Sequence, residues 1–211
     1  MRAATFVDNQ VVLADRPDPV PGAGELLVRV RAAGLNRGDQ LQMFGFYPAP
    51  PGVPPDIPGL ELAGEVVGIG PSVFRFSTGD RVLAVVGGGA QAELAIVPEF
   101  IAMPMPDDIG WVQAGAIPES CMTAHDAMFT QCRLGMSERV LISGAAGGVG
   151  TAAIVLAAEA GARVTATVRN PDLREAVAHL GADAIAPEDL EAHGPYDVIV
   201  ELIGAPNMPA N

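Results

Sequence analysis

The sequence predicts an α/β protein in which a β-rich domain precedes a domain built on a doubly wound parallel sheet. Three observations support this prediction. Residues 25–32 alternate between apolar and charged side chains, which is typical of a half-buried strand. From Arg139 onward, short apolar runs alternate with helical segments, as expected for parallel strands joined by helices. Between the first such run and its helix lie Gly144, Gly147 and Gly150, at the spacing of a dinucleotide-binding turn.

The composition restricts the classes of function that fit the chain. Hydrophobic residues make up 49% of the 211 and charged residues 18%, which is typical of a globular protein. The formal net charge of −13 disfavours nucleic acid and anionic membranes as partners. All 12 positively charged side chains are arginines, so Schiff-base chemistry and a lysine general base are excluded.

Location is predicted from the apolar runs and the cysteines. No apolar run approaches the roughly 20 residues of a membrane span, and the N-terminal run is too short for a secretion signal. Cys121 and Cys132 lack metal-ligand spacing and indicate reduced thiols. We therefore expect a cytoplasmic protein.

The first domain, residues 1–118, is expected to consist mostly of strands. The strand at 25–32 places Leu26, Val28 and Val30 on one face and arginines on the other. Further strands are predicted at 62–69, 81–86 and 92–97. A short helix is predicted over 36–44, and the proline-rich loop at 47–56 that follows it cannot form regular structure.

The second domain, residues 119–211, begins with a helix predicted over 118–129, which Ser120 is placed to cap. Its alternating pattern implies a parallel sheet flanked by helices. The predicted strands are 139–143, 163–168, 183–186 and 196–202, and the predicted helices start at about 148 and span 171–180.

The glycine-rich turn is the strongest candidate for a binding site. Its first glycine permits a tight turn, its second lets a pyrophosphate approach the backbone, and its third lets the helix pack closely on the strand. The alternative is an ordinary strand-to-helix turn without a ligand. The candidate cofactor-binding residues of this turn are Gly144, Ala145, Ala146, Gly147, Gly148, Val149 and Gly150.

The end of the second strand of this domain indicates which cofactor is preferred. Sites that prefer NADH carry an acidic residue there, about 20 residues after the turn, to bind the ribose hydroxyls. Here the strand ends in Thr167 and Arg169, and the next acidic residue is Asp172. Arg169 is suited to pair with a 2′-phosphate, helped by Thr167 and by Arg174, which favours NADPH over NADH. The alternative for Arg169 is a solvated side chain before a proline. Leu202 and Gly204, after a later parallel strand, are candidates to line the cofactor ribose.

Several motifs in this order resemble those of the zinc-independent medium-chain dehydrogenases/reductases, close to the NAD(P)H:quinone oxidoreductases. The motifs are Gly34-Leu-Asn-Arg-Gly-Asp39, Pro58-Gly-Leu-Glu-Leu-Ala-Gly-Glu65, Gly79-Asp-Arg-Val82, Gly87-Gly-Gly-Ala-Gln-Ala92, Ala116-Ile-Pro-Glu119, Thr123-Ala124 and the glycine-rich turn. The resemblance implies a GroES-like catalytic domain followed by a Rossmann domain, and a homodimer.

The same resemblance implies a departure from the family at the end of the chain. The relatives continue well past the position of Asn211, so the Rossmann domain is expected to be truncated at its C-terminus, with an unpaired parallel edge. We expect either a fragment or completion by another chain.

The resemblance also implies hydride transfer without a metal. Zinc-dependent relatives have cysteine and histidine ligands where this chain has Asn36 and Leu60, and their third ligand falls near Glu119. The expected acceptor is therefore already electron-poor, such as a quinone or an activated alkene.

Three residues are candidates for the catalytic site. Asn36 is similar to the family residue near nicotinamide and substrate, where its amide would donate to a developing oxyanion; the alternative is a residue that ties down its own turn. Tyr47 is placed to donate a proton or to stack on a quinone, or is simply a surface aromatic residue. Thr123 matches the family threonine beside the nicotinamide, or bonds its own helical turn.

Other chemically capable side chains are predicted to be structural. His125, His179 and His193 have no partners at ligand spacing, and Cys121 lies in a predicted helix. Glu61 is interpreted as a buried, paired carboxylate, with a general acid as the alternative.

Two other functions remain open from the sequence. One is an enoyl-thioester reductase of the polyketide type, because the same domain plan serves that reaction. The other is a non-catalytic protein that binds NADPH as a sensor or scaffold.

Overall fold

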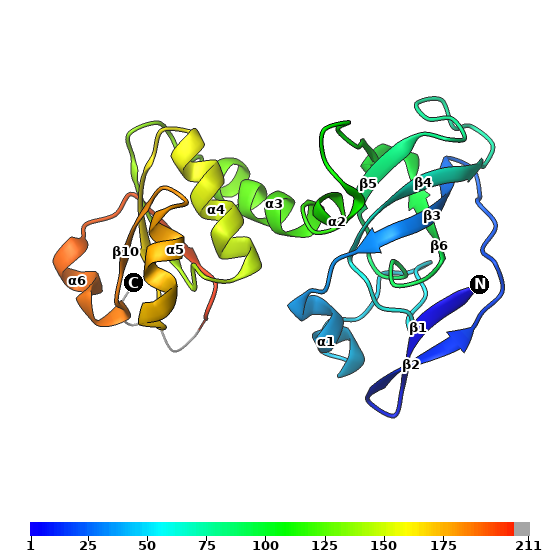
Figure 1. Ribbon diagram of the computed structural model, residues 1–211, viewed down its shortest axis with the longest axis horizontal. Coiled ribbons are helices and arrows are strands. Elements are labelled where there is room, and N and C mark those ends of the chain that lie inside the picture. The colour runs from blue at the N-terminus through cyan, green and yellow to red at the C-terminus, as the bar shows by residue number, and fades with distance from the viewer. Residues whose placement is uncertain (205–211) are drawn as a thin grey trace. The chain divides into compact units, whose positions relative to one another are not determined.

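A computed structural model describes residues 1–204 of the chain, which forms two compact units. The first unit spans Met1–Glu119, and the second starts at Ser120 (Figure 1). The turn expected after Gly204 and the chain end at Asn211 lie outside the described residues. In the part of the chain that is described, no helix combines the length and the apolar character needed to cross a membrane.

The first unit is organised around an antiparallel sheet of five strands. In spatial order these are β6 (Leu94–Pro98), β3 (Glu25–Ala33), β4 (Glu61–Ile69), β5 (Arg81–Val85) and β7 (Met103–Pro104). The alternation in β3 has the predicted effect, because Leu26 and Val28 are fully buried while Arg29 and Arg31 are exposed. The predicted strands β3, β4, β5 and β6 are confirmed to within about two residues at their ends.

An N-terminal hairpin lies beside this sheet and has no counterpart among the predicted strands. It pairs β1 (Arg2–Val7) with β2 (Gln10–Asp15) through a two-residue turn in which Asp8 and Asn9 have positive φ angles of 50° and 59°. Such a turn matches the twist of antiparallel strands. The backbone of β1 also bonds to residues 91–93, which ties the hairpin to the rest of the unit.

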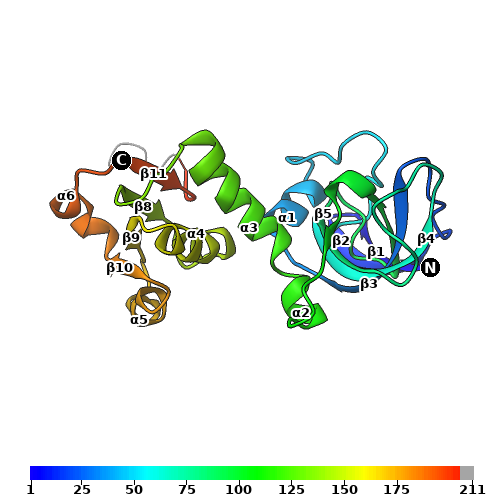
Figure 2. The same ribbon diagram turned by 90° about the horizontal axis from the view of Figure 1, so that it is seen from above.

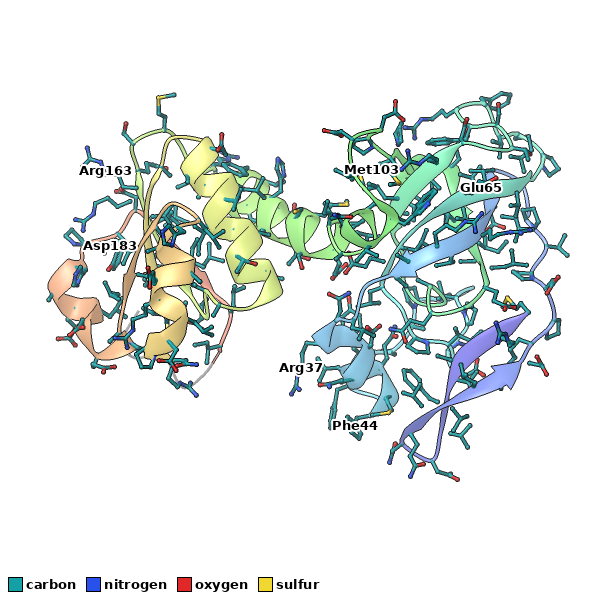
Figure 3. The ribbon with its side chains drawn as sticks, in the orientation of Figure 1. Arg37, Phe44, Glu65, Met103, Arg163 and Asp183 are labelled. Carbon is teal, nitrogen blue, oxygen red and sulfur yellow. The ribbon has the colours of Figure 1, made fainter. Side chains whose placement is uncertain are left out.

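The helices of the first unit are short. They are α1 (Arg37–Met43), η1 (Glu99–Ile101) and α2 (Trp111–Ala114). The predicted helix at 36–44 is thus confirmed as α1, with Asn36 as its N-cap residue. The labelled side chains of Arg37 and Phe44 mark its two ends in Figure 3.

The second unit contains the predicted parallel sheet. Its strands lie in the order β10 (Ala182–Ile185), β9 (Arg163–Thr167), β8 (Arg139–Ser143) and β11 (Val198–Glu201). The helices that follow β8, β9 and β10 are α4 (Gly148–Glu159), α5 (Arg174–Ala178) and α6 (Leu190–His193). Figure 2 shows α4 and α6 on opposite sides of the sheet, as expected for a doubly wound arrangement. The core of the unit includes Val140, Ile142 and Ile154.

The helical predictions for the second unit need three corrections. The helix predicted over 118–129 is an α-helix only in α3 (Pro118–His125) and continues as a π-helix, η2 (Asp126–Gln131). Ser120 lies inside α3, two residues past its start, and is therefore not its N-cap. The helix predicted over 171–180 begins with a 3-10 turn, η3 (Pro171–Leu173), and α5 ends at Ala178. A second 3-10 turn, η4 (Pro187–Asp189), precedes α6.

Candidate functional site

The glycine-rich turn joins the end of β8 to the start of α4 in the second unit. Gly144 has a φ of +73°, which a residue with a side chain rarely adopts, so the tight turn needs a glycine. The N–H of Gly147 donates to the carbonyl oxygen of Gly144 at 3.1 Å. Gly147 is the N-cap of the 12-residue helix α4, and no side chain caps that end. The first turn of α4 therefore presents backbone N–H groups without a side-chain acceptor.

The glycines of this turn have two roles: Gly150 allows close packing, and Gly147 leaves open space. A Cβ on Gly150 would lie 2.6 Å from Cα of Ala145, so this position can hold only a glycine if the turn and the helix are to pack this closely. A Cβ on Gly147 would meet its nearest heavy atom, the Gly144 carbonyl oxygen, only at 3.5 Å. Gly147, Gly148 and Ala146 are exposed, whereas Ala145 and Gly150 are buried. The protein thus leaves an open space over the helix N-terminus, which fits a pyrophosphate.

Strands β8, β9 and β11 each end in a polar residue. Ser143 is only 1% exposed, and its Oγ has no hydrogen-bond partner among the described residues. In the sheet register Ser143 lies between Thr167 on β9 and Glu201 on β11. A buried hydroxyl without a partner is unusual, and here it lies directly before the turn. This feature is compatible with a polar ligand at this edge of the sheet.

The predicted 2′-phosphate residues lie at the end of β9. Arg169 is exposed, and Arg174 reaches back so that its Nε donates to the carbonyl oxygen of Val168 at 3.0 Å. Thr167 differs, because only 4% of its surface is exposed. Asn170 accepts a hydrogen bond from the N–H of Asp172 and so begins the 3-10 turn.

Leu202 and Gly204 follow β11 on a short turn that Glu201 closes. The carboxylate of Glu201 accepts hydrogen bonds from the N–H groups of Ile203 and Gly204, at 2.6 and 2.8 Å. Leu202 keeps 38% of its surface exposed. A Cβ on Gly144 would come within 3.4 Å of Leu202 and 3.1 Å of Ile203, so this turn lies beside the glycine-rich turn, as the candidate ribose site requires.

Asn36 lies at the start of α1 in the first unit. Its side-chain nitrogen Nδ2 donates to Oε1 of Glu61 at 2.8 Å, and its backbone N–H donates to Oδ2 of Asp39 at 2.8 Å. Glu61 is 2% exposed and also accepts from the N–H of Glu119 at 2.9 Å. The interpretation of Glu61 as a buried, paired carboxylate therefore agrees with the structure. The hydrogen bond from Asn36 spans 25 residues of sequence, so Asn36 does more than tie down its own turn.

Asp39 is a second buried carboxylate that the sequence reasoning did not single out. It is 8% exposed and accepts hydrogen bonds from the N–H of Gly59 at 2.9 Å and from Nε2 of Gln91 at 3.4 Å. The signal was present in the sequence, since an Asn at the N-cap followed three residues later by an acidic residue marks a capping box.

Tyr47 lies in the loop that follows α1. A Cβ on Gly38 would come within 3.8 Å of Cε1 of Tyr47, so the ring lies beside the helix that Asn36 caps. Tyr47 is 47% exposed. Thr123 is exposed on α3, in the second unit.

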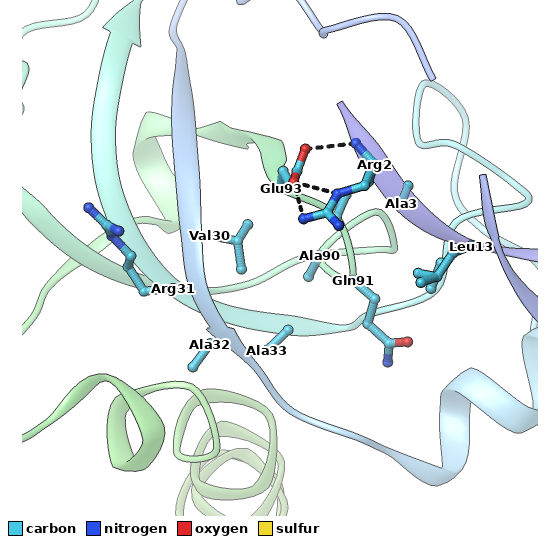
Figure 4. Close-up of a pocket in the computed structure, with 12 residues that line it drawn as sticks. Arg2, Ala3, Leu13, Val30, Arg31, Ala32, Ala33, Ala90, Gln91 and Glu93 are labelled. Atoms are coloured by element: carbon cyan, nitrogen blue, oxygen red, sulfur yellow. Dashed lines mark hydrogen bonds and ion pairs between the residues drawn. The ribbon is translucent and has the colours of Figure 1, made fainter. Parts of the chain in front are cut away.

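The first unit has two cavities in this region, and Asn36 lines one of them. One, of about 430 Å³, is lined by Asn36, by apolar side chains such as Phe6 and Leu35, and by polar side chains such as Arg37, Asp39 and Gln91. The other, of about 390 Å³, lies between β1 and β3 and is lined mainly by alanines (Figure 4). At its rim Arg2 and Glu93 form the salt bridge drawn in that figure. The cavity beside Asn36 is the better candidate for an acceptor site, because its wall combines apolar side chains with hydrogen-bonding groups.

Metal ligands were not expected in this chain. Among residues 1–204 the structure contains no group of three or more His, Cys, Asp or Glu side chains that could hold a metal ion. Leu60, at the position of a histidine ligand in zinc-dependent relatives, is buried against the space at Gly38.

Comparison with known proteins agrees with this architecture. The family model described as "Alcohol dehydrogenase GroES-like domain" matches residues 22–107. The solved quinone oxidoreductase from Thermus thermophilus, whose title names a complex with NADPH, is 33% identical with a TM-score of 0.85, and the alignment covers 100% of this chain and 69% of that one. The chain belongs to the medium-chain dehydrogenase/reductase family.

Two further proteins are similar to parts of this chain. The chloroplastic quinone-oxidoreductase homologue of Spinacia oleracea is 39% identical over 210 residues, covering 90% of this chain and 62% of the relative. Erythronolide synthase EryA2 of Saccharopolyspora erythraea is 42% identical over 145 residues, covering 69% of this chain and 4% of that protein. The chain spans 61–62% of the length of the plant quinone oxidoreductase relatives that it matches.

Proposed function

We propose that this medium-chain dehydrogenase/reductase transfers hydride from NADPH to a quinone or an activated alkene, without a metal. The observation that carries the proposal is the open N-terminus of α4 beside the glycine-rich turn. When bound, a reduced nicotinamide supplies the hydride. The protein then has to bind the cofactor, orient the acceptor and exclude water.

The cofactor pyrophosphate is assigned to the turn from Gly144 to Gly150. The exposed backbone at Ala146, Gly147 and Gly148 leaves room for the phosphates, and the uncapped N–H groups of α4 and its dipole favour negative charge there. Leu202 and Gly204 are assigned to the ribose side of the site, next to this turn.

NADPH is proposed over NADH because of the groups at the end of β9. Arg169 is exposed there, and no acidic residue precedes Asp172 to bind free ribose hydroxyls. Arg174 lies over the same strand end through its bond to Val168, which supports a second contact to the 2′-phosphate. Thr167 is buried, so its proposed contribution is secondary to that of the arginines.

The acceptor is assigned to the cavity beside Asn36. Electron-poor acceptors need no Lewis acid, and this cavity offers apolar side chains together with the amide of Asn36 and other polar groups. Asn36 is proposed to donate a hydrogen bond to the oxygen that gains charge, and Tyr47 to stack on the acceptor or to donate a proton. Thr123 is proposed to contact the nicotinamide. We further propose a cytoplasmic homodimer that binds neither membrane nor nucleic acid.

The experiment that tests cofactor assignment is a titration of the purified chain with NADPH and NADH, followed by nicotinamide fluorescence and melting temperature. Arg169→Ala is expected to weaken NADPH binding about 10- to 100-fold and to leave NADH binding unchanged, because a charge-assisted hydrogen bond contributes about 1.5–3 kcal/mol. Arg163→Ala is the matched control, since Arg163 is an exposed arginine at the opposite end of the same strand. Equal weakening of both cofactors would show that Arg169 does not contact the 2′-phosphate.

A second candidate function is reduction of an enoyl thioester, which the similarity to a segment of erythronolide synthase favours. Steady-state assays with a simple quinone, a cyclic enone and a crotonyl thioester separate the two reactions by their kcat/KM values. NADPH binding without turnover of any acceptor would instead support the third possibility, a non-catalytic sensor or scaffold.

A further inference from the structure

Glu61 makes a different kind of contact with each of its two carboxylate oxygens. Oε1 accepts from the side-chain nitrogen of Asn36, and Oε2 accepts from the backbone N–H of Glu119, in the first turn of α3. The side chain is 2% exposed, so water cannot replace either partner. Each oxygen of Glu61 therefore has an assigned hydrogen-bond donor within the first unit.

We propose that Glu61 is a positioning residue that fixes the orientation of the Asn36 carboxamide, so that an N–H of Asn36 is available to an acceptor in the cavity. Both oxygens of Glu61 accept hydrogen bonds, so the nitrogen of Asn36 turns toward Glu61 and the oxygen of Asn36 turns away. One N–H of the Asn36 side chain donates to Glu61, and the second N–H is left to donate to the oxygen of the acceptor. The functional part of this inference rests on the function proposed above, whereas the orientation itself does not.

Replacing Glu61 by glutamine reverses this arrangement. The backbone N–H of Glu119 still needs an acceptor. In Glu61→Gln the new amide oxygen therefore takes the place of Oε2 and accepts from that N–H. The amide NH₂ group is then directed at Asn36, which must offer its oxygen in return. The variant keeps the volume and the two hydrogen bonds but inverts the carboxamide of Asn36.

The kinetic test compares Glu61→Gln with Asn36→Ala and with the double variant. We expect Glu61→Gln to lower kcat about 10- to 100-fold, somewhat less than the 10²–10³ typical of a lost oxyanion donor, with the KM for NADPH unchanged. In the Asn36→Ala background the same change should have no further effect on kcat, because Glu61 acts through Asn36. Additive losses, or a lower melting temperature with an unchanged kcat, would overturn the proposal.

A matched control for Glu61→Gln is available on β4, the strand that also carries Glu61. Glu65 is a half-buried residue of β4 that pairs with Arg31 at 3.1 Å, and Glu65→Gln makes the same chemical change away from Asn36. This control should keep the kcat of the wild type. A loss in the control equal to that in Glu61→Gln would show a general effect of lost charge and would count against the proposal.

The rescue variant separates positioning from stability. Asn36→Asp combined with Glu61→Gln restores a charge-assisted hydrogen bond of reversed polarity, so stability should recover. The kcat should not recover, because the carboxylate introduced by Asn36→Asp cannot donate a hydrogen bond to the acceptor. Recovery of both would refute a positioning role.

Nuclear magnetic resonance tests the orientation without any turnover. The side-chain NH₂ signals of Asn36 are identified by their loss in Asn36→Ala. In the wild type, one of these protons should exchange slowly with solvent, and in Glu61→Gln that protection should pass to the new glutamine side chain. An unprotected Asn36 amide in the wild type, or an unchanged one in the variant, would contradict the inference. If the wild type reduces no acceptor while this spectrum is as expected, the proposed function fails and the orientation stands.

Discussion

At the scale of single residues, the space beside Glu61 is among the most restricted in the first unit. A Cβ built on Gly34 would lie 2.0 Å from Oε1 of Glu61 and 2.5 Å from its Cδ. Gly34 does not have a positive φ, so its backbone conformation would accept a side chain. The glycine is required because a buried carboxylate occupies the volume next to it.

Gly34→Ala should therefore displace Glu61 from both of its partners. Loss of the two hydrogen bonds around a buried carboxylate is expected to lower the free energy of unfolding by about 2–3 kcal/mol, which urea denaturation measures. Gly68→Ala is the control, because a Cβ there meets its nearest atom at an ordinary 3.4 Å. If Gly34→Ala were as stable as this control, Glu61 would have room to move and its hydrogen bonds would be of minor importance.

The pair Arg2 and Glu93 gives a pH-dependent contribution to stability. The backbone N–H of Arg2 and then its guanidinium donate to Glu93 and hold the pKa of that carboxyl below its ordinary value of 4.5. A lowered folded-state pKa adds stability above pH 4.5 that is lost as the pH falls through the folded-state value. Denaturant unfolding between pH 3 and 7 should show a smaller loss on acidification in Glu93→Gln than in the wild type. An identical acid dependence would mean that the pair does not stabilise the folded state.

At the scale of elements, the glycine-rich turn combines a packing requirement with a binding requirement. Gly150→Ala is expected to destabilise the second unit by about 1–3 kcal/mol, because its Cβ would overlap the backbone of Ala145. Gly147→Ala should cost at most about 1 kcal/mol of stability, as a less favourable N-cap. It should nevertheless raise the Kd for NADPH at least about tenfold, because the methyl group enters the space proposed for the pyrophosphate.

Calorimetry and fluorescence titration separate these two effects. Tight NADPH binding by Gly147→Ala would place the pyrophosphate elsewhere. A Gly150→Ala protein as stable as the wild type would show that helix α4 can move away from β8 without loss.

The elements predicted correctly from the sequence are those whose burial is periodic. Strand β3 alternates between buried and exposed residues, and β8 is buried along nearly its whole length. Strand β2 is exposed along almost its entire length although its sequence is Gln10-Val-Val-Leu-Ala-Asp15, so no period of two reveals it. The change from α3 to the π-helix η2 could not be predicted either, because a wider turn over only six residues leaves no periodic pattern in the sequence.

For the candidate site, too, the features that are local in sequence could be predicted and those that depend on distant residues could not. The glycine-rich turn is local in sequence and could be predicted from its spacing. The partners of Asn36 and Asp39 could not, since Glu61 and Gly59 lie 25 and 20 residues away and only the fold brings them together.

At the scale of the whole molecule, the two units have separate hydrophobic cores. The larger core of the first unit includes Leu26, Leu62 and Val82, and the core of the second includes Val140, Ile142 and Ile154. Burial of apolar side chains stabilises each core from within its own unit. A ligand held by the second unit is thus expected to protect a limited part of the chain.

Hydrogen exchange measured by mass spectrometry tests this expectation. NADPH should slow exchange in peptides covering residues 143–150 and 167–174, because a bound ligand suppresses local opening around its site. The β1–β2 hairpin should exchange at the same rate with and without NADPH. Protection of the hairpin, or none at the glycine-rich turn, would require a different binding site.

The position of β3 inside its sheet has a consequence for synthesis of the protein. β3 forms one ladder with β4 and the other with β6, where Leu26 faces Val97. At about 5–20 residues per second, a ribosome needs roughly 4–14 s to pass from the first of these residues to the second. For that time the nascent strand exposes a hydrogen-bonding edge and apolar side chains, which other chains can bind. Chaperone contact during translation is therefore expected to concentrate on β3, because its partner β6 leaves the ribosome later than its partner β4.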